Sequence, residues 1–223
     1  MEIIAIQSWQ KPMNCIHLFG CAKKNVYLCS IIAIATVMAT TFVIKMSNRK
    51  LTALEMHRIS IDEFKQSRKT PLVVVLDDVR SMYNVGSVFR TADAFRIERI
   101  CLCGITARPP HPEIHKTALG AEDSVDWTYD ADTHEAVRRL QADGYRVMAI
   151  EQVEGSTMLQ DFIPEDGGKY AVVMGNEVKG VKQTVVDMCD GCIEIPQFGT
   201  KHSLNVSTTA GIVMWEVLKK MKL

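Results

Sequence analysis

The hydrophobic positions after residue 70 follow two alternating patterns, short apolar runs and segments with helical spacing. Residues 71–79 (PLVVVLDDV) form a β-branched run that is typical of a buried central strand. Downstream, Val85, Val88, Phe89 and Ala92 recur at intervals of three and four, which predicts a helix with one apolar face. This alternation predicts an α/β fold that has a mostly parallel sheet with helices on both faces.

The same patterns place the other elements. Apolar runs predict further strands at residues 99–103, 125–129, 145–150, 170–174 and 192–196. Helices are predicted at residues 133–143, with Asp132 as the N-cap and Gly144 after the last turn, and at 207–220. Between the second and third strands, the PPHP sequence from residue 109 is expected to begin a long irregular crossing.

The region before the first strand divides into two parts. Ser60 and Glu63 have the spacing of a capping box, which predicts a short helix within an N-terminal extension, residues 46–70. Residues 71–223 then form the main domain. Residues 25–44 contain no charged side chain, and a helix of this length spans about 30 Å, the thickness of a bilayer core.

Two interpretations of residues 1–45 follow. They are a membrane anchor through residues 25–44, or they precede the true start of translation at Met46. We prefer the second, because the segment has no caps and no amphipathic period, whereas everything after it resembles one globular domain. It implies a cytoplasmic protein with no membrane contact. A signal peptide fits less well, since no small-residue cleavage site precedes Lys45.

The charge and cysteine content of the chain say little about its ligands or its reaction. The formal net charge is zero, with 26 Lys and Arg against 26 Asp and Glu, so composition alone does not indicate a nucleic-acid partner. Residues 1–45 carry four of these cations and one of the acids, which leaves −3 for the rest. Of the seven cysteines, Cys189 and Cys192 form a CxxC without a second ligand pair. We therefore expect reduced structural thiols and no metal site.

Three predicted strands are each followed by a set of polar residues that a core does not need. These sets are NxGxxxR at residues 84–90, GNExxG at 175–180 and FGTKHSLN at 198–205. Because ligands of open α/β sheets bind beyond the carboxyl ends of the strands, we expect the three loops to converge. Taken singly, Asn84, Ser203 and Asn205 also fit helix caps, and Glu177 also fits a solvated loop charge.

Extended to NxGxxxRTADAF (residues 84–95), MGNEVKGV (174–181) and IPQFGTKHSLNVSTTAGI (195–212), these sets resemble the three ordered motifs of the SpoU (TrmH) family. The match covers about residues 71–220. The resemblance implies an RNA methyltransferase that transfers a methyl group from S-adenosylmethionine to a ribose 2′-hydroxyl. It also implies a deep C-terminal trefoil knot, and a homodimer in which the partner completes each active site.

The resemblance carries over residue by residue. The polar active-site positions are Asn84, Arg90, Glu177, Ser203 and Asn205. The cofactor contacts are Met174, Gly175, Asn176, Gly180, Ile195, Gly199, Ser203 and Leu204. The glycines are expected to allow turns and close backbone approach. A guanidinium is a poor base, so Arg90 either acts on the developing 2′-alkoxide or anchors an RNA phosphate, and both roles stay open.

The RNA itself is less well defined. Many members that modify rRNA carry a separate N-terminal RNA-binding domain, and we find none in this sequence, which favours tRNA over rRNA. A non-catalytic RNA-binding module on the same fold is the other alternative. Cations close to the motifs in sequence are candidates for a local basic surface; they are Arg80, Arg96, Arg99, Arg108, Lys116, Lys179, Lys182 and Lys201. His111, His115 and His202 are expected to be structural or solvated.

Overall fold

The computed structural model describes residues 48–52 and 54–221 and divides the chain into two units between Arg58 and Ile59. The predicted anchor, residues 25–44, and the predicted start at Met46 lie outside the described residues. Within the described part, no helix has the length and apolar character needed to cross a membrane.

The smaller unit is described over residues 48–52 and 54–58, and its main feature is a local ion pair. The Arg49 guanidinium contacts the Glu55 carboxylate at 2.6 Å, and the backbone N–H of Thr52 donates to the same carboxylate at 2.8 Å. The Arg49 hydrogen bond, followed by those from Thr52, lowers the pKa of Glu55 to about 2.

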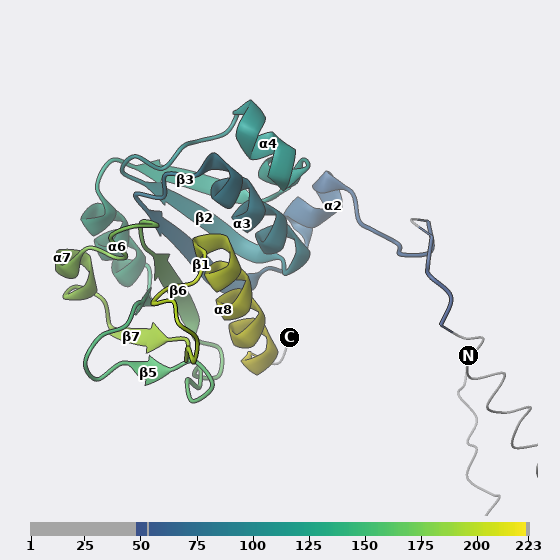
Figure 1. Cartoon of the computed structure of the whole chain (residues 1–223). Helices are drawn as coiled ribbons and strands as arrows, with labels where there is room; N and C mark the ends of the chain where they lie inside the picture. Colours follow the sequence, from purple (N-terminus) through teal and green to yellow (C-terminus); the bar gives the residue numbers. More distant parts are fainter. Residues whose placement is uncertain (1–47, 53, 222–223) are drawn as a thin grey trace, which may run out of the picture. The chain divides into compact units, whose positions relative to one another are not determined.

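In the larger unit, the described residues form a seven-stranded sheet in the order β3-β2-β1-β6-β4-β7-β5, and every strand pair is parallel (Figure 1). The strands are β1 (Thr70–Asp77), β2 (Ile97–Cys103), β3 (Asp126–Asp130), β4 (Tyr145–Ile150), β5 (Thr157–Met158), β6 (Lys169–Met174) and β7 (Gly191–Glu194). The predicted parallel α/β architecture is therefore confirmed.

The sheet is buried on both faces by helices. Leu72, Val74 and Leu76 of β1 pack on the face covered by α3 (Met82–Ala94) and α8 (Val206–Lys220), which lie in front of the sheet in Figure 1. The alternate residues Val73 and Val75 pack on the other face, with α6 (Thr133–Ala142) and α7 (Gln183–Val186). All five side chains are fully buried, as the β-branched run predicts.

The strand order determines where loops from distant parts of the chain meet. From β1 the chain adds β2 and then β3 on one side, and β4 then crosses to the other side of β1. β6 is inserted between β1 and β4, and β7 pairs with the far side of β4. The carboxyl ends of β6, β4 and β7 are therefore adjacent, which is where an open α/β sheet binds ligands.

The crossing between β2 and β3 differs from the sequence prediction. Instead of a long irregular segment, it contains α4 (Pro112–Ala118) and α5 (Ala121–Ser124). The His111 imidazole accepts a hydrogen bond from the backbone N–H of Glu113, and Pro112 occupies the first turn, where its missing N–H costs nothing. Pro112 is thus a helix start here. The short elements β5 and α7 were also not predicted.

The predicted N-terminal helix is α2 (Ile61–Gln66), and both arms of its capping box are present. The Ser60 hydroxyl accepts from the Glu63 backbone N–H, and the Glu63 carboxylate accepts from the Ser60 backbone N–H at 2.7 Å. Phe64 is buried in the same core as α3 and α8. α2 is consequently part of the larger unit.

Candidate functional site

A cavity of about 740 Å³ opens at the adjoining carboxyl ends of β6, β4 and β7. Met174 and Ile193, both buried, form part of its floor. Its walls come from the loop after β4, the loop after β6 and the segment between β7 and α8. The volume lies within the range of small-molecule and cofactor sites.

The three motifs are joined by a chain of side-chain hydrogen bonds at this cavity. The Asn205 Nδ2 donates to Asn84 Oδ1 at 3.1 Å, and Asn84 Nδ2 donates to Glu177 Oε1 at 3.0 Å. Glu177 and Asn205 line the cavity, whereas Asn84 is buried in the first turn of α3. The predicted convergence of the loops is thus present as direct contact between their side chains.

The Glu177 side chain binds backbone N–H groups at the start of α3. Its carboxylate accepts hydrogen bonds from the backbone N–H groups of Arg80 and Ser81, each at 2.9 Å, in addition to the Asn84 amide. Burial alone raises the pKa of Glu177, but the hydrogen bonds from Arg80, Ser81 and Asn84 outweigh it, so the pKa lies below its ordinary value. Glu177 is therefore an ionised acceptor that is exposed on one side and bonded to the start of α3 on the other.

Asn205 combines the two roles considered for it. Its Oδ1 accepts from the backbone N–H groups of Ser207 and Thr208, so it is the N-cap of α8. Its Nδ2 remains available and donates to Asn84. Asn84 itself is not a cap, because Ser81 occupies that position of α3. Ser203 is exposed and lines the cavity without capping α8.

The loop after β6 is a tight turn closed by backbone bonds between Asn176 and Gly180. A Cβ on Gly175 would collide with the backbone of Gly180 and Val181, and Gly180 has a φ of +66°, which favours glycine. The Asn176 Oδ1 accepts from the N–H groups of the next residues, while its Nδ2 donates to the carbonyl of Asp78 at 2.8 Å. The loop is therefore fixed to the end of β1.

The predicted cofactor residues mostly line the cavity. Those that do are Met174, Gly175, Asn176, Gly180, Ile195, Ser203 and Leu204. Gly199 is not among the lining residues, and a Cβ built on it meets nothing within 4 Å. No described protein atom therefore requires glycine at residue 199 in the structure, and its contact with the cofactor stays a prediction.

Arg90 is the predicted active-site residue that the fold does not bring to this cavity. It is exposed on α3, and its side chain forms no hydrogen bond or ion pair within residues 48–52 and 54–221. Since Asn84 lies six residues earlier on the same helix, Arg90 lies more than one turn further along α3.

Sequence reasoning missed two polar residues that follow β4. The Glu151 Oε2 accepts from the backbone N–H of Val181 at 3.0 Å, and Gln152 Nε2 donates to the carbonyl of His202 at 3.2 Å. Both residues line the cavity and tie its walls together. Their position directly after a buried strand is the feature that could have identified them.

The other histidines and the cysteines have structural surroundings. His111 caps α4, and His115 contacts Glu122 at 2.6 Å. The Cys189 thiol donates to the carbonyl of Val185, and burial raises its pKa to about 12. In the described parts of the chain, no three His, Cys, Asp or Glu side chains are grouped so as to hold a metal ion.

The SpoU rRNA Methylase family model matches residues 71–215, which is more than half of the 223-residue chain. The chain belongs to this family. The matched region contains all three motifs and extends from the second residue of β1 into α8.

Named relatives of this SpoU family chain include two proteins called 23S rRNA (guanosine-2′-O-)-methyltransferase RlmB. The protein of Vibrio parahaemolyticus is 29% identical over 77% of this chain and 68% of its own length. That of Coxiella burnetii is 30% identical over 70% of this chain and 61% of its own length. The chain thus spans about two thirds of the length of these relatives.

Solved structures show the same fold. The AdoMet-bound rRNA methyltransferase from Sinorhizobium meliloti has a TM-score of 0.63 at 27% identity, covering 70% of this chain and 59% of that one. The TrmH/SpoU tRNA modifying enzyme of A. aeolicus has the same TM-score at 21% identity, covering 72% and 81%. At that identity the second likeness concerns the fold alone.

Proposed function

We propose that this protein transfers a methyl group from S-adenosylmethionine to a ribose 2′-hydroxyl of RNA. The observation that carries the proposal is the hydrogen-bonded series Asn205–Asn84–Glu177, which joins the three family motifs at one cavity. The names of the relatives supply the reaction class, since both are guanosine 2′-O-methyltransferases. An intact polar set also favours an enzyme over a non-catalytic RNA-binding module.

The cavity suits S-adenosylmethionine in size and charge. Its lining contains the carboxylates of Glu151, Glu177 and Glu194. Among the described residues that line it, Lys179 is the one Lys or Arg. This acidic excess complements S-adenosylmethionine, which carries a sulfonium and an ammonium group against one carboxylate and is therefore net positive. When bound, the cofactor supplies a methyl group activated by the positive sulfur. The residues of the chain position the ligand and exclude water around it.

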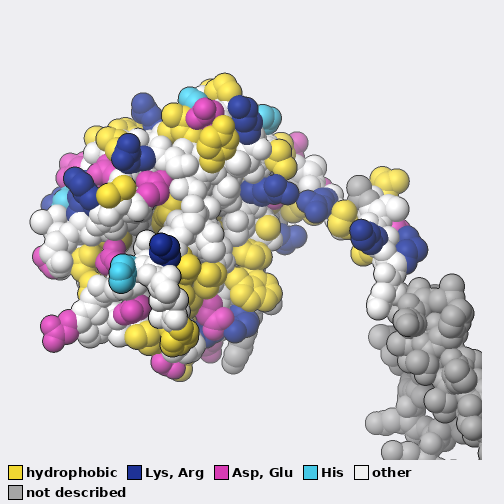
Figure 2. All heavy atoms as spheres, viewed as in Figure 1, with side chains coloured by type: hydrophobic (Ala, Val, Ile, Leu, Met, Phe, Trp, Pro, Cys, Tyr) yellow, Lys and Arg dark blue, Asp and Glu magenta, His cyan; other side chains and the backbone are white. Residues whose placement is uncertain are grey.

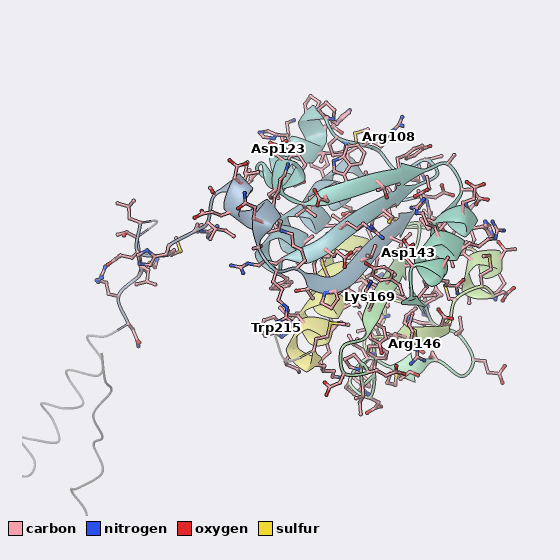
Figure 3. The ribbon with its side chains drawn as sticks, turned by 180° about the vertical axis from the view of Figure 1, so that it is seen from behind. Arg108, Asp123, Asp143, Arg146, Lys169 and Trp215 are labelled. Carbon is pink, nitrogen blue, oxygen red and sulfur yellow. The ribbon has the colours of Figure 1, made fainter. Side chains whose placement is uncertain are left out.

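We propose that the active unit is a homodimer that pairs the exposed sides of α3 and α8. The two helices cross closely, since a Cβ on Gly211 would lie 3.9 Å from the Thr91 methyl group. Large apolar side chains are exposed on both helices, with Ile212 and Trp215 on α8 close to this crossing and Tyr83 in the first turn of α3. Figure 2 shows hydrophobic side chains gathered over α8, and Figure 3 marks Trp215 on that helix.

In the proposed dimer, Arg90 would act at the cavity of the partner chain and not at its own. Because Arg90 is exposed on α3 away from its own cavity, pairing through this helix would carry it to the partner's site. There the guanidinium would stabilise the negative charge that develops on the 2′-oxygen, or hold the adjacent phosphate. It would not act as the base, since a guanidinium remains protonated. The 2′-hydroxyl proton would pass instead to the adjacent RNA phosphate, and S-adenosylhomocysteine would leave as the methyl group is transferred.

We also propose the trefoil knot for the segment between β7 and α8. The carbonyl of His202 accepts from Gln152 in the loop after β4, and Leu204 lines the cavity opposite the loop after β6. The chain then continues into α8, which packs on the β1 side of the sheet. Passage of this segment between the two loops would form the knot.

Tritiated methyl incorporation tests the function. The protein is incubated with labelled S-adenosylmethionine and either 23S rRNA, which the named relatives favour, or tRNA, and the nucleosides are then separated. We expect label in a 2′-O-methylribose. Arg90→Ala should keep its cofactor affinity but lose about a hundredfold or more in turnover, since a transition-state charge contact is removed.

Arg138→Ala is the matched control, because Arg138 is exposed on α6 and does not line the cavity. It should methylate at the parental rate. Label in a base would contradict the proposed reaction, and an Arg90→Ala variant as active as the parent would contradict the role of Arg90.

A further inference from the structure

A second cavity of about 280 Å³ lies beside the first, at the carboxyl end of β1. The two cavities share the loop after β6, since residues 176 and 178–180 line both. The second cavity is otherwise lined by Asp77, Asp78, Arg80, Ile105 and Lys182. Any group held there lies one loop away from the site where the methyl group would be transferred.

The two carboxylates of this cavity are already paired within the chain. Lys182 Nζ contacts Asp78 Oδ2 at 2.6 Å and Asp77 Oδ1 at 3.6 Å. The Thr133 hydroxyl also donates to Asp77, and the backbone N–H of Ile105 donates to Asp78 at 2.9 Å. The contact with Asp78 raises the pKa of Lys182, so this pair remains charged near neutral pH. Lys182 therefore offsets one of the two carboxylate charges, and the three cations of the lining (Arg80, Lys179 and Lys182) outnumber its two acids by one.

Two other cations, Arg80 and Lys179, line the cavity outside the Lys182 ion pairs. Among the described residues, the side chains of Arg80 and Lys179 form no ion pair or hydrogen bond. Their backbones are nevertheless fixed, because Arg80 N–H donates to Glu177 and Lys179 N–H donates to the Asn176 side chain. A rigid backbone that presents free cations into a cavity is suited to binding an anion.

We propose that this second cavity binds a phosphodiester group of the substrate RNA, next to the nucleotide that is methylated, through Arg80 and Lys179. The inference rests on the proposed RNA methyltransferase function. The exposed aliphatic side chains of Ile105 and Val178 line the cavity beside the cations and offer contact to a ribose or base face. The phosphate contacts of Arg80 and Lys179 would set the register of the RNA without reading its sequence.

The salt dependence of RNA binding tests the proposal directly. Fluorescence anisotropy of a labelled 23S rRNA fragment, titrated over a series of KCl concentrations, gives the slope of log K against log salt. Each phosphate contact adds about 0.7 to 0.9 to that slope, so Arg80→Gln with Lys179→Gln should make it shallower by about one. The paired substitutions Arg80→Lys and Lys179→Arg should retain the parental slope, because they keep both charges.

Arg138→Gln is the control for loss of an unrelated surface cation and should also keep the parental slope. A parental slope in the Arg80→Gln, Lys179→Gln protein would overturn the proposal. So would a changed nucleotide preference at an unchanged slope, because that outcome indicates base reading. A failure of the proposed function is a separate result, since the parent protein would then bind RNA with a normal slope but transfer no methyl group.

Discussion

At the cavity, the single side chain of Glu177 joins the loop after β6 to the start of α3. Both of its oxygens are occupied, by two backbone N–H groups and one amide that belong to the start of α3. The residue type was expected from the motif, but the partners lie 93 to 97 positions earlier in the chain. No local pattern could identify them, because they meet only where β1 and β6 pair.

Glu177→Gln should destabilise the protein by about 1 kcal/mol at pH 7, since an NH₂ group would then face an N–H donor. The expected loss of stability is small because Glu177 is exposed and its charge is screened by solvent. With its folded pKa below the ordinary value of 4.5, the contribution of Glu177 is full above about pH 5 and falls as the pH drops through the folded pKa.

Urea unfolding between pH 7 and about pH 3 measures this effect. The difference between parent and Glu177→Gln should shrink toward low pH. Glu154→Gln, at an exposed position without a hydrogen-bond partner in the described chain, should show no such difference at any pH. An equal loss of stability for Glu177→Gln at all pH values would mean that its charge is irrelevant.

At the scale of elements, the sequence predicted the long helices and strands correctly and missed short ones. The β1 run is long and β-branched, and the α3 stripe has enough repeats to define a helical period. α4 and α7 span seven and four residues, so their apolar period is hardly visible. The loop after β6 is shaped instead by contacts of its glycines, of which Gly175 is the most crowded.

Gly175→Ala should cost about 1 to 3 kcal/mol, because the added methyl group overlaps the backbone of Gly180 and Val181 and neither can move independently of the loop. Gly199→Ala is the matched control. It adds the same methyl group in open space and should change the stability by less than about 0.5 kcal/mol. Thermal unfolding of both variants checks the pair, and equal losses would show that the crowding at Gly175 is relieved by movement of the loop.

At the scale of the whole molecule, an apolar surface and a displaced arginine occur on the same pair of helices. Arg90 and Tyr83 lie on the exposed side of α3, and Ile212 and Trp215 on that of α8. Exposed apolar residues that gather in this way are typical of a surface that packs against another protein. On the proposed homodimer, this surface would bring Arg90 of one chain to the cavity of its partner.

Light scattering at micromolar concentration should therefore give the mass of two chains, each of 25.0 kDa at full length. Trp215→Glu should shift the protein toward the monomer and reduce methyl transfer, because a charge would be buried in the interface. Arg138→Glu, at an exposed residue of α6 on the sheet face opposite α3 and α8, should remain dimeric. A fully active parental monomer would rule out the shared site.

The sequence by itself determined the class of fold, the types of residue at the site and the family to which they belong. Apolar runs and the 3.6-residue helical period depend only on neighbours along the chain, and so do the spacings inside each motif. These patterns did not predict the order of the strands in the sheet. That order decided that Asn205 meets Asn84 across 121 positions, that Glu151 closes the cavity, and that Arg90 lies outside it. Such contacts depend on which strands pair, because pairing brings together loop ends that the chain keeps far apart.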